Sequence, residues 1–253
     1  MNKTEILALI QFFSLRKTYN FLKLYVSFLI SKTSKSSKIY GLPMALSIEP
    51  TTACNLGCPE CPSGLKQFTR KTGNLSTSLN KKIVDELSGN LTYINYYFQG
   101  EPYINPHFFD FVSYANSKKI FCATSTNGHF LNDENCKKTI ESGLKRLIIS
   151  IDGNNQETYE VYRKNGRFEK VIEGTKNILR WKKKLNSNYP HIIYQFLVVK
   201  TNEHLIDQMK TLASEIGVNE LRIKTAQFYN FKNGNELIPE NDKYSRYIKT
   251  LNG

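Results

Sequence analysis

The sequence predicts an α/β protein whose strands run parallel and alternate with helices. Six short apolar segments have the composition of strands, and segments with helical periodicity separate most of them. Parallel neighbours need a crossover of about a dozen or more residues, and the gaps between these segments are that long. At 253 residues the chain can hold one large domain. The predicted strands are Ala45–Glu49, Tyr93–Phe98, Phe121–Ser125, Leu147–Ile151, Ile192–Val199 and Leu221–Lys224, and the predicted helices of the domain are Asn80–Leu87, Pro106–Ser117, Asp133–Ser142, Phe168–Leu185 and His204–Glu215.

Polar residues follow each predicted strand. A loop with three cysteines follows the first strand, and short polar runs follow the others. The carboxyl ends of parallel strands share one face of a barrel or one edge of a sheet, where ligands bind. We therefore expect the cysteine loop and the polar runs to line one cavity. The runs are Gln99–Pro102, Thr126–Gly128, Asp152–Asn155, Lys200–Asn202 and Thr225–Gln227.

The three cysteines predict a metal site that performs chemistry. Cys54, Cys58 and Cys61 stand at a Cys-x3-Cys-x2-Cys spacing, with no fourth cysteine nearby. Three thiolates can hold three irons of a cubane 4Fe–4S cluster. The fourth iron is then open to a small chelating ligand, in the way that catalytic metal sites keep a vacant position.

Two other interpretations of this cysteine triad are weaker. A zinc site needs a fourth ligand at a paired spacing, which His107, His129 and Cys122 do not supply. Three unrelated buried cysteines would lie on an apolar face, whereas this loop is rich in Asn, Gly and Pro. Cys122 and Cys136 do lie among apolar residues and are predicted to be core residues. Five cysteines form no even disulfide framework, so we expect a reducing cytoplasm.

The segments GLPMALSIEPTTACN (41–55) and CPSGLKQFTR (61–70) resemble the cluster-binding region of the radical S-adenosylmethionine (SAM) superfamily, and more narrowly its SPASM-type members, whose relatives modify peptides and proteins. The resemblance implies a partial (β/α)6 TIM-like barrel over residues 40–253. It also implies a 4Fe–4S cluster and SAM, whose methionine amino and carboxylate groups chelate the open iron. One position differs: Glu60 stands just before the third cysteine, where the superfamily usually carries an aromatic residue beside the adenine.

The same resemblance implies a receptor for the methionine ammonium group of SAM. Gly100 and Glu101 lie in Gln99-Gly100-Glu101-Pro102, which resembles the family's Gly-Gly-Glu-type motif with Gln99 in place of the first glycine. In that motif a backbone carbonyl and the acidic side chain receive the ammonium group. The structural alternative is that Glu101 is an acidic residue that precedes a helix and is favoured there by the helix dipole.

Three further side chains are implied to contact SAM. Ser150 and Asp152 are alternate residues at the end of the fourth predicted strand, so they are expected to point the same way, toward the SAM amino acid or ribose. Asp152 alternatively belongs to a turn and helix cap. Arg163 stands where related enzymes hold the SAM carboxylate, for which a planar guanidinium is suited. The alternatives are that Arg163 is a surface residue or that Lys164 takes this place.

These observations predict the core of a radical SAM enzyme that reductively cleaves SAM to a 5'-deoxyadenosyl radical. The implied partners are a reducing electron donor and a substrate of the peptide or protein class, and no residue is assigned as a general acid or base. The alternative function is a noncatalytic iron–sulfur module that binds or transfers electrons. A metal-independent membrane or nucleic-acid protein is a third class. The 35 basic and 22 acidic residues permit an anionic partner, but no nucleic-acid-binding motif is present, so we expect no nucleic acid.

Residues 1–39 are predicted to form a basic, amphipathic helical extension. Apolar residues recur in helical runs between residues 5 and 30, and three basic residues interrupt them. The run is too interrupted to span a membrane and lacks the parts of a secretory signal. It either lies on a membrane surface or packs over the open side of the main domain. Ser31–Lys38 is predicted to be a linker.

The end of the chain carries a separate expectation. SPASM-type relatives continue past the core into a cysteine-rich region that binds auxiliary clusters, and no such region precedes Gly253. The expectation is a core from a truncated or split member, which cleaves SAM without tight coupling to substrate modification because its barrel mouth is poorly sealed.

Overall fold

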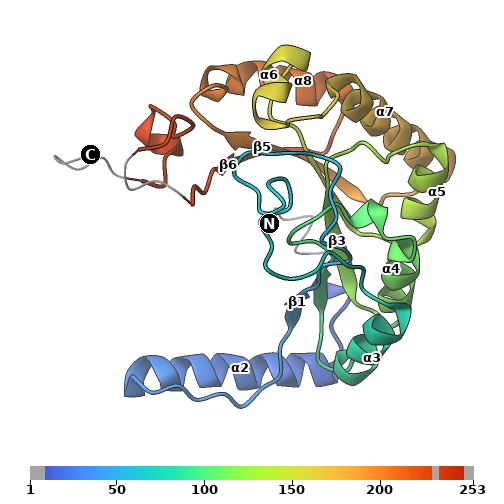
Figure 1. Ribbon diagram of the computed structural model, residues 1–253. Helices are drawn as coiled ribbons and strands as arrows, with labels where there is room; N and C mark the ends of the chain where they lie inside the picture. The colour runs from blue at the N-terminus through green and yellow to red at the C-terminus, as the bar shows by residue number, and fades with distance from the viewer. Residues whose placement is uncertain (1–8, 230–233, 248–253) are drawn as a thin grey trace.

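One curved, six-stranded parallel sheet forms the centre of the protein. The computed structural model describes residues 9–229 and 234–247, and in it the strands lie side by side in chain order from β1 to β6. Every neighbouring pair is parallel. Figure 1 shows the sheet as an arc that opens between β1 and β6, with helices along its outer side. The predicted α/β class and the partial barrel are confirmed. The strands are β1 Ala45–Ser47, β2 Tyr93–Asn95, β3 Phe121–Thr126, β4 Arg146–Ser150, β5 His191–Val198 and β6 Glu220–Thr225.

Polar caps begin several of the outer helices. Ser76, Asn132 and Asn155 each accept a backbone N–H three residues ahead, where the first turn of a helix leaves donors unsatisfied. The domain helices are α3 Thr77–Leu87, α4 Phe108–Ser117, α5 Asp133–Glu141, α6 Gln156–Tyr162, α7 Phe168–Lys184 and α8 Ile206–Ile216. Three short 3-10 turns are η1 Pro102–Ile104, η2 Glu203–Leu205 and η3 Asp242–Tyr244. The sequence prediction missed α6 and all three 3-10 turns.

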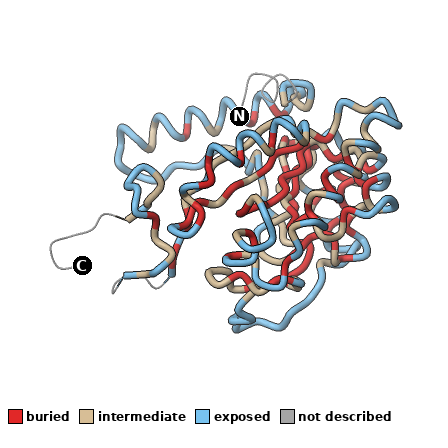
Figure 2. Tube along the Cα trace, turned by 90° about the horizontal axis from the view of Figure 1, so that it is seen from above, coloured by how far each residue is buried: buried red, intermediate tan, exposed pale blue. Residues whose placement is uncertain are grey.

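The core lies between the sheet and the outer helices. All five residues of β4 are buried, as expected for a central parallel strand that is covered on both faces. Figure 2 shows the buried residues concentrated along the sheet and the inner sides of the helices. Cys122 and Cys136 are fully buried in this core, so the prediction that they are core residues is confirmed.

Helix α2, Leu15–Ser34, lies apart from the other helices. Ser14 caps its first turn, and α2 forms the lower border of the opening in Figure 1 without crossing it. The helix therefore does not pack over the open side of the domain. The predicted linker Ser31–Lys38 was wrong for its first four residues, which continue α2 because side chains hold the helix against the segment that follows it. Residues 1–8 of the predicted extension lie outside the described residues. Among the described helices, none is long and apolar enough to cross a membrane.

A second, smaller cluster of buried residues holds the cysteine loop against the last two strands. Leu56 from the loop packs in it with Tyr162, Val199 and Phe228. Cys58 belongs to the same cluster. The loop that follows β1 is therefore anchored across the concave side of the sheet, next to the ends of β5 and β6.

Candidate functional site

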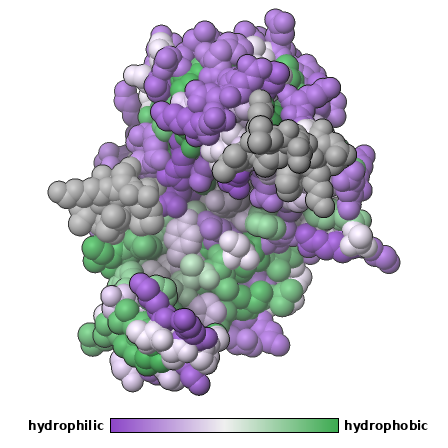
Figure 3. Space-filling model, turned by 90° about the vertical axis from the view of Figure 1, so that its left-hand side faces the viewer, coloured by the Kyte–Doolittle hydropathy of each residue, from purple (hydrophilic) through white to green (hydrophobic). Residues whose placement is uncertain are grey.

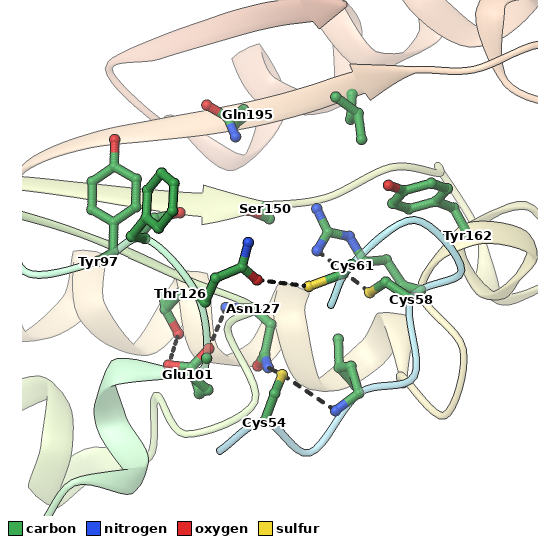
Figure 4. A pocket seen from close by; sticks show the side chains of 17 residues that line it. Cys54, Cys58, Cys61, Tyr97, Glu101, Thr126, Asn127, Ser150, Tyr162 and Gln195 are labelled. Carbon is green, nitrogen blue, oxygen red and sulfur yellow. Dashed lines mark hydrogen bonds between the residues drawn. The ribbon is translucent and has the colours of Figure 1, made fainter. Parts of the chain in front are cut away.

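The carboxyl ends of the strands surround a cavity of about 260 Å³ that all three loop cysteines line. Polar groups from the runs that follow β2 and β3 line it as well, together with residues of β4 and β5. Figure 4 shows the cysteine side chains gathered beside Glu101, Asn127 and Ser150. The predicted convergence therefore holds for two of the five polar runs, whereas Asp152–Asn155, Lys200–Asn202 and Thr225–Gln227 contribute no lining residue. The lining residues are Cys54, Leu56, Cys58, Cys61, Tyr97, Phe98, Gln99, Gly100, Glu101, Ser125, Thr126, Asn127, Ser150, Tyr162, Arg163, Gln195 and Leu197.

Backbone hydrogen bonds fix the cysteine loop on two sides. Glu101 N–H donates to the Ala53 carbonyl at 2.8 Å, and Gly57 N–H donates to the Lys164 carbonyl at 2.9 Å. The loop also turns tightly on itself. A Cβ atom at Gly64 would lie 2.6 Å from the Cys58 nitrogen, so only glycine fits this close approach. The sulfur positions are therefore set by the polypeptide before any ligand binds.

The donor set of the loop suits an iron–sulfur cluster. Three soft sulfur ligands favour such a cluster over hard cations. Among the described residues, no three His, Cys, Asp or Glu side chains converge on a single ion. Burial raises the pKa of Cys54 to about 11 and also raises the pKa of Cys58, so the thiolate forms need a nearby cation, which a bound metal would supply.

Polar groups contact the cysteine sulfurs. Leu56 N–H donates to Cys54 Sγ at 3.5 Å, and Arg163 Nη1 donates to Cys58 Sγ at 3.8 Å. Cys61 Sγ donates to Gln99 Oε1 at 3.3 Å. Hydrogen bonds to sulfur are one of the means by which proteins set the potential of a bound cluster.

Glu101 is buried beside the cysteines with three donors on its carboxylate. Thr126 Oγ1 and Tyr103 N–H donate to its Oε1 at 2.8 and 3.3 Å, and Asn127 N–H donates to its Oε2 at 2.7 Å. Burial nevertheless raises the pKa of Glu101 to about 7, although these donors act in the opposite direction. A carboxylate has about four acceptor positions, so one remains for a cationic ligand in the cavity.

Gly100 brings the backbone of this motif against the start of the cysteine loop. Its φ of +76° is accessible to glycine, and a Cβ there would lie 2.2 Å from the Thr51 carbonyl oxygen. The neighbouring Ser63 hydroxyl accepts from the Gly100 N–H at 2.9 Å. The contact joins the polar run after β2 to the loop that carries the metal ligands.

Arg163 lines the cavity, and Asp152 lies behind it. Arg163 Nε donates to Asp152 Oδ2 at 2.5 Å, and Leu197 N–H donates to Asp152 Oδ1 at 2.7 Å. Asp152 is fully buried and is not among the lining residues. Strand β4 ends at Ser150, so the alternation expected for Ser150 and Asp152 does not continue to Asp152, whereas Ser150 does face the cavity. Lys164 is exposed and contributes its carbonyl to Gly57.

Glu60 has a different environment from that of an aromatic residue over an adenine. Its Oε1 accepts from Asn235 Nδ2 at 2.9 Å, and its Oε2 accepts from Tyr229 N–H at 3.3 Å. The carboxylate therefore links the cysteine loop to the segment that follows β6. Composition gave no signal for this pairing, because its partners lie about 170 residues further along the chain.

The sequence prediction also missed several residues that line the cavity. Gln195 lies inside β5, and Tyr97 and Tyr162 line the same space. Asn127 Nδ2 donates to Asn55 Oδ1 at 2.7 Å and lies 3.9 Å from Cys54 Sγ. Asn127 belongs to the predicted polar run Thr126–Gly128, so the sequence did indicate that it lies near the cavity. Gln195 is a polar residue within an otherwise apolar predicted strand, and this difference could have identified it.

A family model and several curated relatives match more than half of this chain. The family model described as the Radical SAM superfamily matches residues 48–195. Mycofactocin maturase MftC of Mycobacterium tuberculosis (strain ATCC 25618 / H37Rv) is 29% identical over 181 residues, which are 72% of this chain and 44% of the maturase. AdoMet-dependent heme synthase of Methanosarcina barkeri is 31% identical over 176 residues, 69% of this chain and 48% of the synthase. The chain thus spans about half the length of these curated relatives.

A solved structure has the same fold. The crystal structure of Streptococcus suis SuiB bound to S-adenosylmethionine superposes with a TM-score of 0.65 and 13% sequence identity. The match covers 86% of this chain and 48% of SuiB. At this identity the likeness concerns the fold, and it supports the interpretation of the parallel arc as a partial barrel.

Proposed function

The chain belongs to the radical SAM superfamily, and from this premise we propose that the cavity holds a 4Fe–4S cluster on Cys54, Cys58 and Cys61 together with SAM. The observation that carries the proposal is that the matched region places all three cysteines on one cavity with a buried carboxylate and a guanidinium. Family membership agrees with the two cofactors expected from the sequence. A reduced cluster held by Cys54, Cys58 and Cys61 would supply the one electron needed to cleave SAM reductively to a 5'-deoxyadenosyl radical, the species that would take hydrogen from a substrate.

The residues of this chain bind and orient the ligand. Glu101 and the Gly100 carbonyl are our proposed receptors for the SAM ammonium group, because they lie next to the cysteines. Arg163 is our proposed partner of the SAM carboxylate, since a guanidinium has five N–H donors and the contacts to Asp152 and Cys58 use only two of them. Ser150 offers a hydroxyl to the amino acid or ribose from the end of β4.

Asp152 takes a positioning role in this proposal. Its carboxylate holds Arg163 Nε and the backbone of β5 at the same time, and Asn202 Nδ2 donates to its backbone carbonyl at 3.0 Å. A guanidinium held on one side by a buried carboxylate presents its remaining donors in a fixed direction. Asp152 therefore acts on SAM through Arg163.

We infer a peptide or protein as the substrate class and a separate reductant as the electron donor. Support comes from residues 41–70, which resemble SPASM-type members whose relatives modify peptides and proteins. Transfer of deuterium from a labelled peptide into 5'-deoxyadenosine would identify such a substrate. A noncatalytic iron–sulfur module is the alternative, and it predicts a cluster that binds without any SAM cleavage on reduction.

The first prediction concerns the metal ligands. Anaerobic reconstitution of the wild-type chain is expected to give about four irons per chain and, after reduction with SAM, 5'-deoxyadenosine. The variant with Cys54, Cys58 and Cys61 all replaced by alanine is expected to lose both, because the thiolates hold the irons. Iron analysis, electron paramagnetic resonance and chromatography of the nucleoside measure this outcome. Cys136→Ala is the matched control and should retain the cluster. A cluster that persists in the triple variant would refute the assignment.

The second prediction concerns SAM affinity. Loss of one charge-assisted hydrogen bond costs about 1.5 to 3 kcal/mol, so Glu101→Gln and Arg163→Ala should each weaken binding roughly tenfold to hundredfold. The carboxylate form of Glu101 is the one that binds an ammonium group. With its pKa at about 7, wild-type affinity should fall as pH drops below about 7, by about tenfold per pH unit, and Glu101→Gln should remove this dependence.

Equilibrium titration of the reconstituted variants with SAM measures their affinities, and the iron content of each variant is measured in parallel. Iron content should not change, because neither residue is proposed to bind iron. Glu134→Gln, at an exposed position on α5, is the control. Equal affinity in Glu101→Gln, or a pH slope that survives the substitution, would contradict the proposed role of the carboxylate.

A further inference from the structure

Helix α2 is amphipathic in the opposite sense to a helix packed on a core. Its inner stripe, the side that faces the rest of the protein, carries the polar residues Lys17, Asn20, Ser27 and Ser31, with one half-buried apolar residue, Leu24, among them. Its outer stripe, which faces away, consists of Leu15, Tyr19, Leu22, Val26 and Leu29, which recur every three or four residues and so share one helix face. Figure 2 shows α2 as almost wholly exposed. The apolar side of the helix is therefore the side without a protein neighbour among the described residues.

Hydrogen bonds from the inner stripe fix this orientation. Lys17 Nζ donates to the Lys119 carbonyl at 2.6 Å, just past the end of α4. Asn20 Nδ2 donates to the Leu42 carbonyl, and Asn20 Oδ1 accepts from Leu42 N–H, both at 2.8 Å. Ser27 Oγ accepts from Tyr40 N–H at 2.9 Å. A rotation of α2 that buried the outer stripe would break all of these hydrogen bonds. They therefore stabilise the orientation in which the outer stripe faces away from the protein.

The segment that follows α2 returns along the helix and extends the apolar surface. Gly41 permits the close approach, because a Cβ there would lie 2.7 Å from Leu24 Cγ. Ile39, Tyr40 and Leu42 on this segment are exposed. Twelve of the eighteen exposed large hydrophobic side chains in the described residues lie between residues 10 and 42. Figure 3 shows hydrophobic side chains gathered on the lower half of its face, on and around the projecting helix, beneath a hydrophilic upper half.

The charge of this region is uniform. Residues 9–48 contain six Lys or Arg and no Asp or Glu. A second copy of the chain would place these positive charges against each other with no acidic residue in the region to pair with them, which disfavours a helix pair between copies. An anionic lipid surface supplies the missing negative charge and accepts the apolar stripe. Tyr19, Tyr25 and Tyr40 also suit the boundary between lipid and water.

We propose that α2 and the return segment 38–42 form a docking surface for an anionic phospholipid bilayer. The outer stripe enters the headgroup region, and the flanking lysines contact lipid phosphates. Lys23 Nζ lies over the Tyr19 ring, 4.5 Å from its centroid, so the ammonium group is held at the border of the outer stripe, on the side of the helix that would face lipid phosphates. This surface does not use the cavity and does not depend on the proposed function of the cysteines.

Cosedimentation of the full chain with vesicles tests the proposal. The wild type should bind vesicles of equal parts phosphatidylcholine and phosphatidylglycerol, and it should bind pure phosphatidylcholine vesicles at least about tenfold more weakly, because each basic residue near an anionic surface contributes about 1 kcal/mol. Added salt should reduce binding to the mixed vesicles. Absence of binding to the mixed vesicles would overturn the proposal.

Two pairs of variants separate the apolar and electrostatic contributions. Leu22→Ser with Leu29→Ser, at positions 51% and 43% exposed, should weaken vesicle binding by at least about tenfold. Leu79→Ser with Leu185→Ser, 49% exposed on α3 and 38% exposed at the C-cap of α7, is the matched control and should bind like the wild type. Lys23→Glu with Lys32→Glu should weaken binding to the mixed vesicles by a similar factor, whereas Lys82→Glu with Lys176→Glu should not.

Sedimentation equilibrium without lipid tests whether a second copy of the chain, and not a bilayer, covers this surface. The wild-type chain should form no dimer that depends on α2. A dimer that forms in the wild type, is lost in Leu22→Ser with Leu29→Ser, and occurs without vesicle binding would show that the surface joins two copies, and would overturn the proposal. Circular dichroism of each variant should match the wild type, since the substituted side chains make no core contact.

Discussion

Asp152→Ala is expected to lower the free energy of unfolding by about 3 to 5 kcal/mol, the range observed when one partner of a buried ion pair is removed. The substitution leaves the Arg163 guanidinium without its counter-ion in a site where only 15% of the arginine side chain is exposed. It also leaves the Leu197 N–H without the acceptor that holds it at 2.7 Å. Chemical denaturation of the cluster-free chain measures the loss.

Two further variants test the cause of this loss. Asp152→Ala combined with Arg163→Met should recover part of the stability, because the uncompensated charge is then removed as well. Asp207→Ala breaks an exposed ion pair with Lys210 and should leave the unfolding midpoint unchanged within error. If Asp152→Ala were no more destabilising than Asp207→Ala, the buried pair could not be what holds β4 and β5 around Arg163.

Gly100→Ala is expected to cost about 2 to 5 kcal/mol of stability. The left-handed backbone conformation costs a non-glycine residue roughly 1 to 2 kcal/mol, and forcing an extra carbon into a packed contact costs about 1 to 3 kcal/mol more. The second contribution arises because the new Cβ would lie 2.2 Å from the Thr51 carbonyl oxygen, and a backbone atom cannot move aside as a flexible side chain can.

Gly217→Ala is the matched control for the Gly100 substitution. Gly217 has a φ of +85° at the end of α8, and no atom lies within 4 Å of the Cβ position. It should therefore show the conformational cost alone. Denaturant unfolding measures the loss of the free energy of unfolding in both variants, and the difference between the two losses is the cost of the Thr51 contact. Equal losses would mean that the backbone near Thr51 moves aside without cost.

The strands could be predicted from the sequence because their signal is local. Each of the six predicted strands overlaps an observed one, since apolar β-branched runs flanked by turn residues reflect the burial of a central parallel strand. Helix α6 was missed because Asp152–Asn155 signals a turn, and the seven residues that follow are too few for a clear helical period. Only the turn before α6 and the helix cap at Asn155 could be predicted from the sequence.

Site residues could be predicted only where they lie close together in one short segment of the sequence. The cysteine spacing and the Gly100–Glu101 pair are read from neighbouring residues, and the structure brings them together. The pairing of Asp152 with Arg163 and the link from Glu60 to Asn235 arise from tertiary contacts that no local pattern encodes. Helix α2 was recognised as amphipathic, but which of its faces turns outward depends on hydrogen bonds to Leu42 and Tyr40.

The strand order implies an order of assembly during synthesis. Because each strand pairs with the strand before it in the chain, the sheet can grow from β1 as the polypeptide emerges, with N-terminal parts folding first. The cysteines emerge just after β1, whereas Arg163 and Leu197, which help to enclose them, emerge more than a hundred residues later. A nascent chain therefore leaves the three thiols uncovered until β5 has paired. The proposed cluster would therefore be enclosed only after the sheet is complete, and an oxidant has its best access to these thiols before that moment.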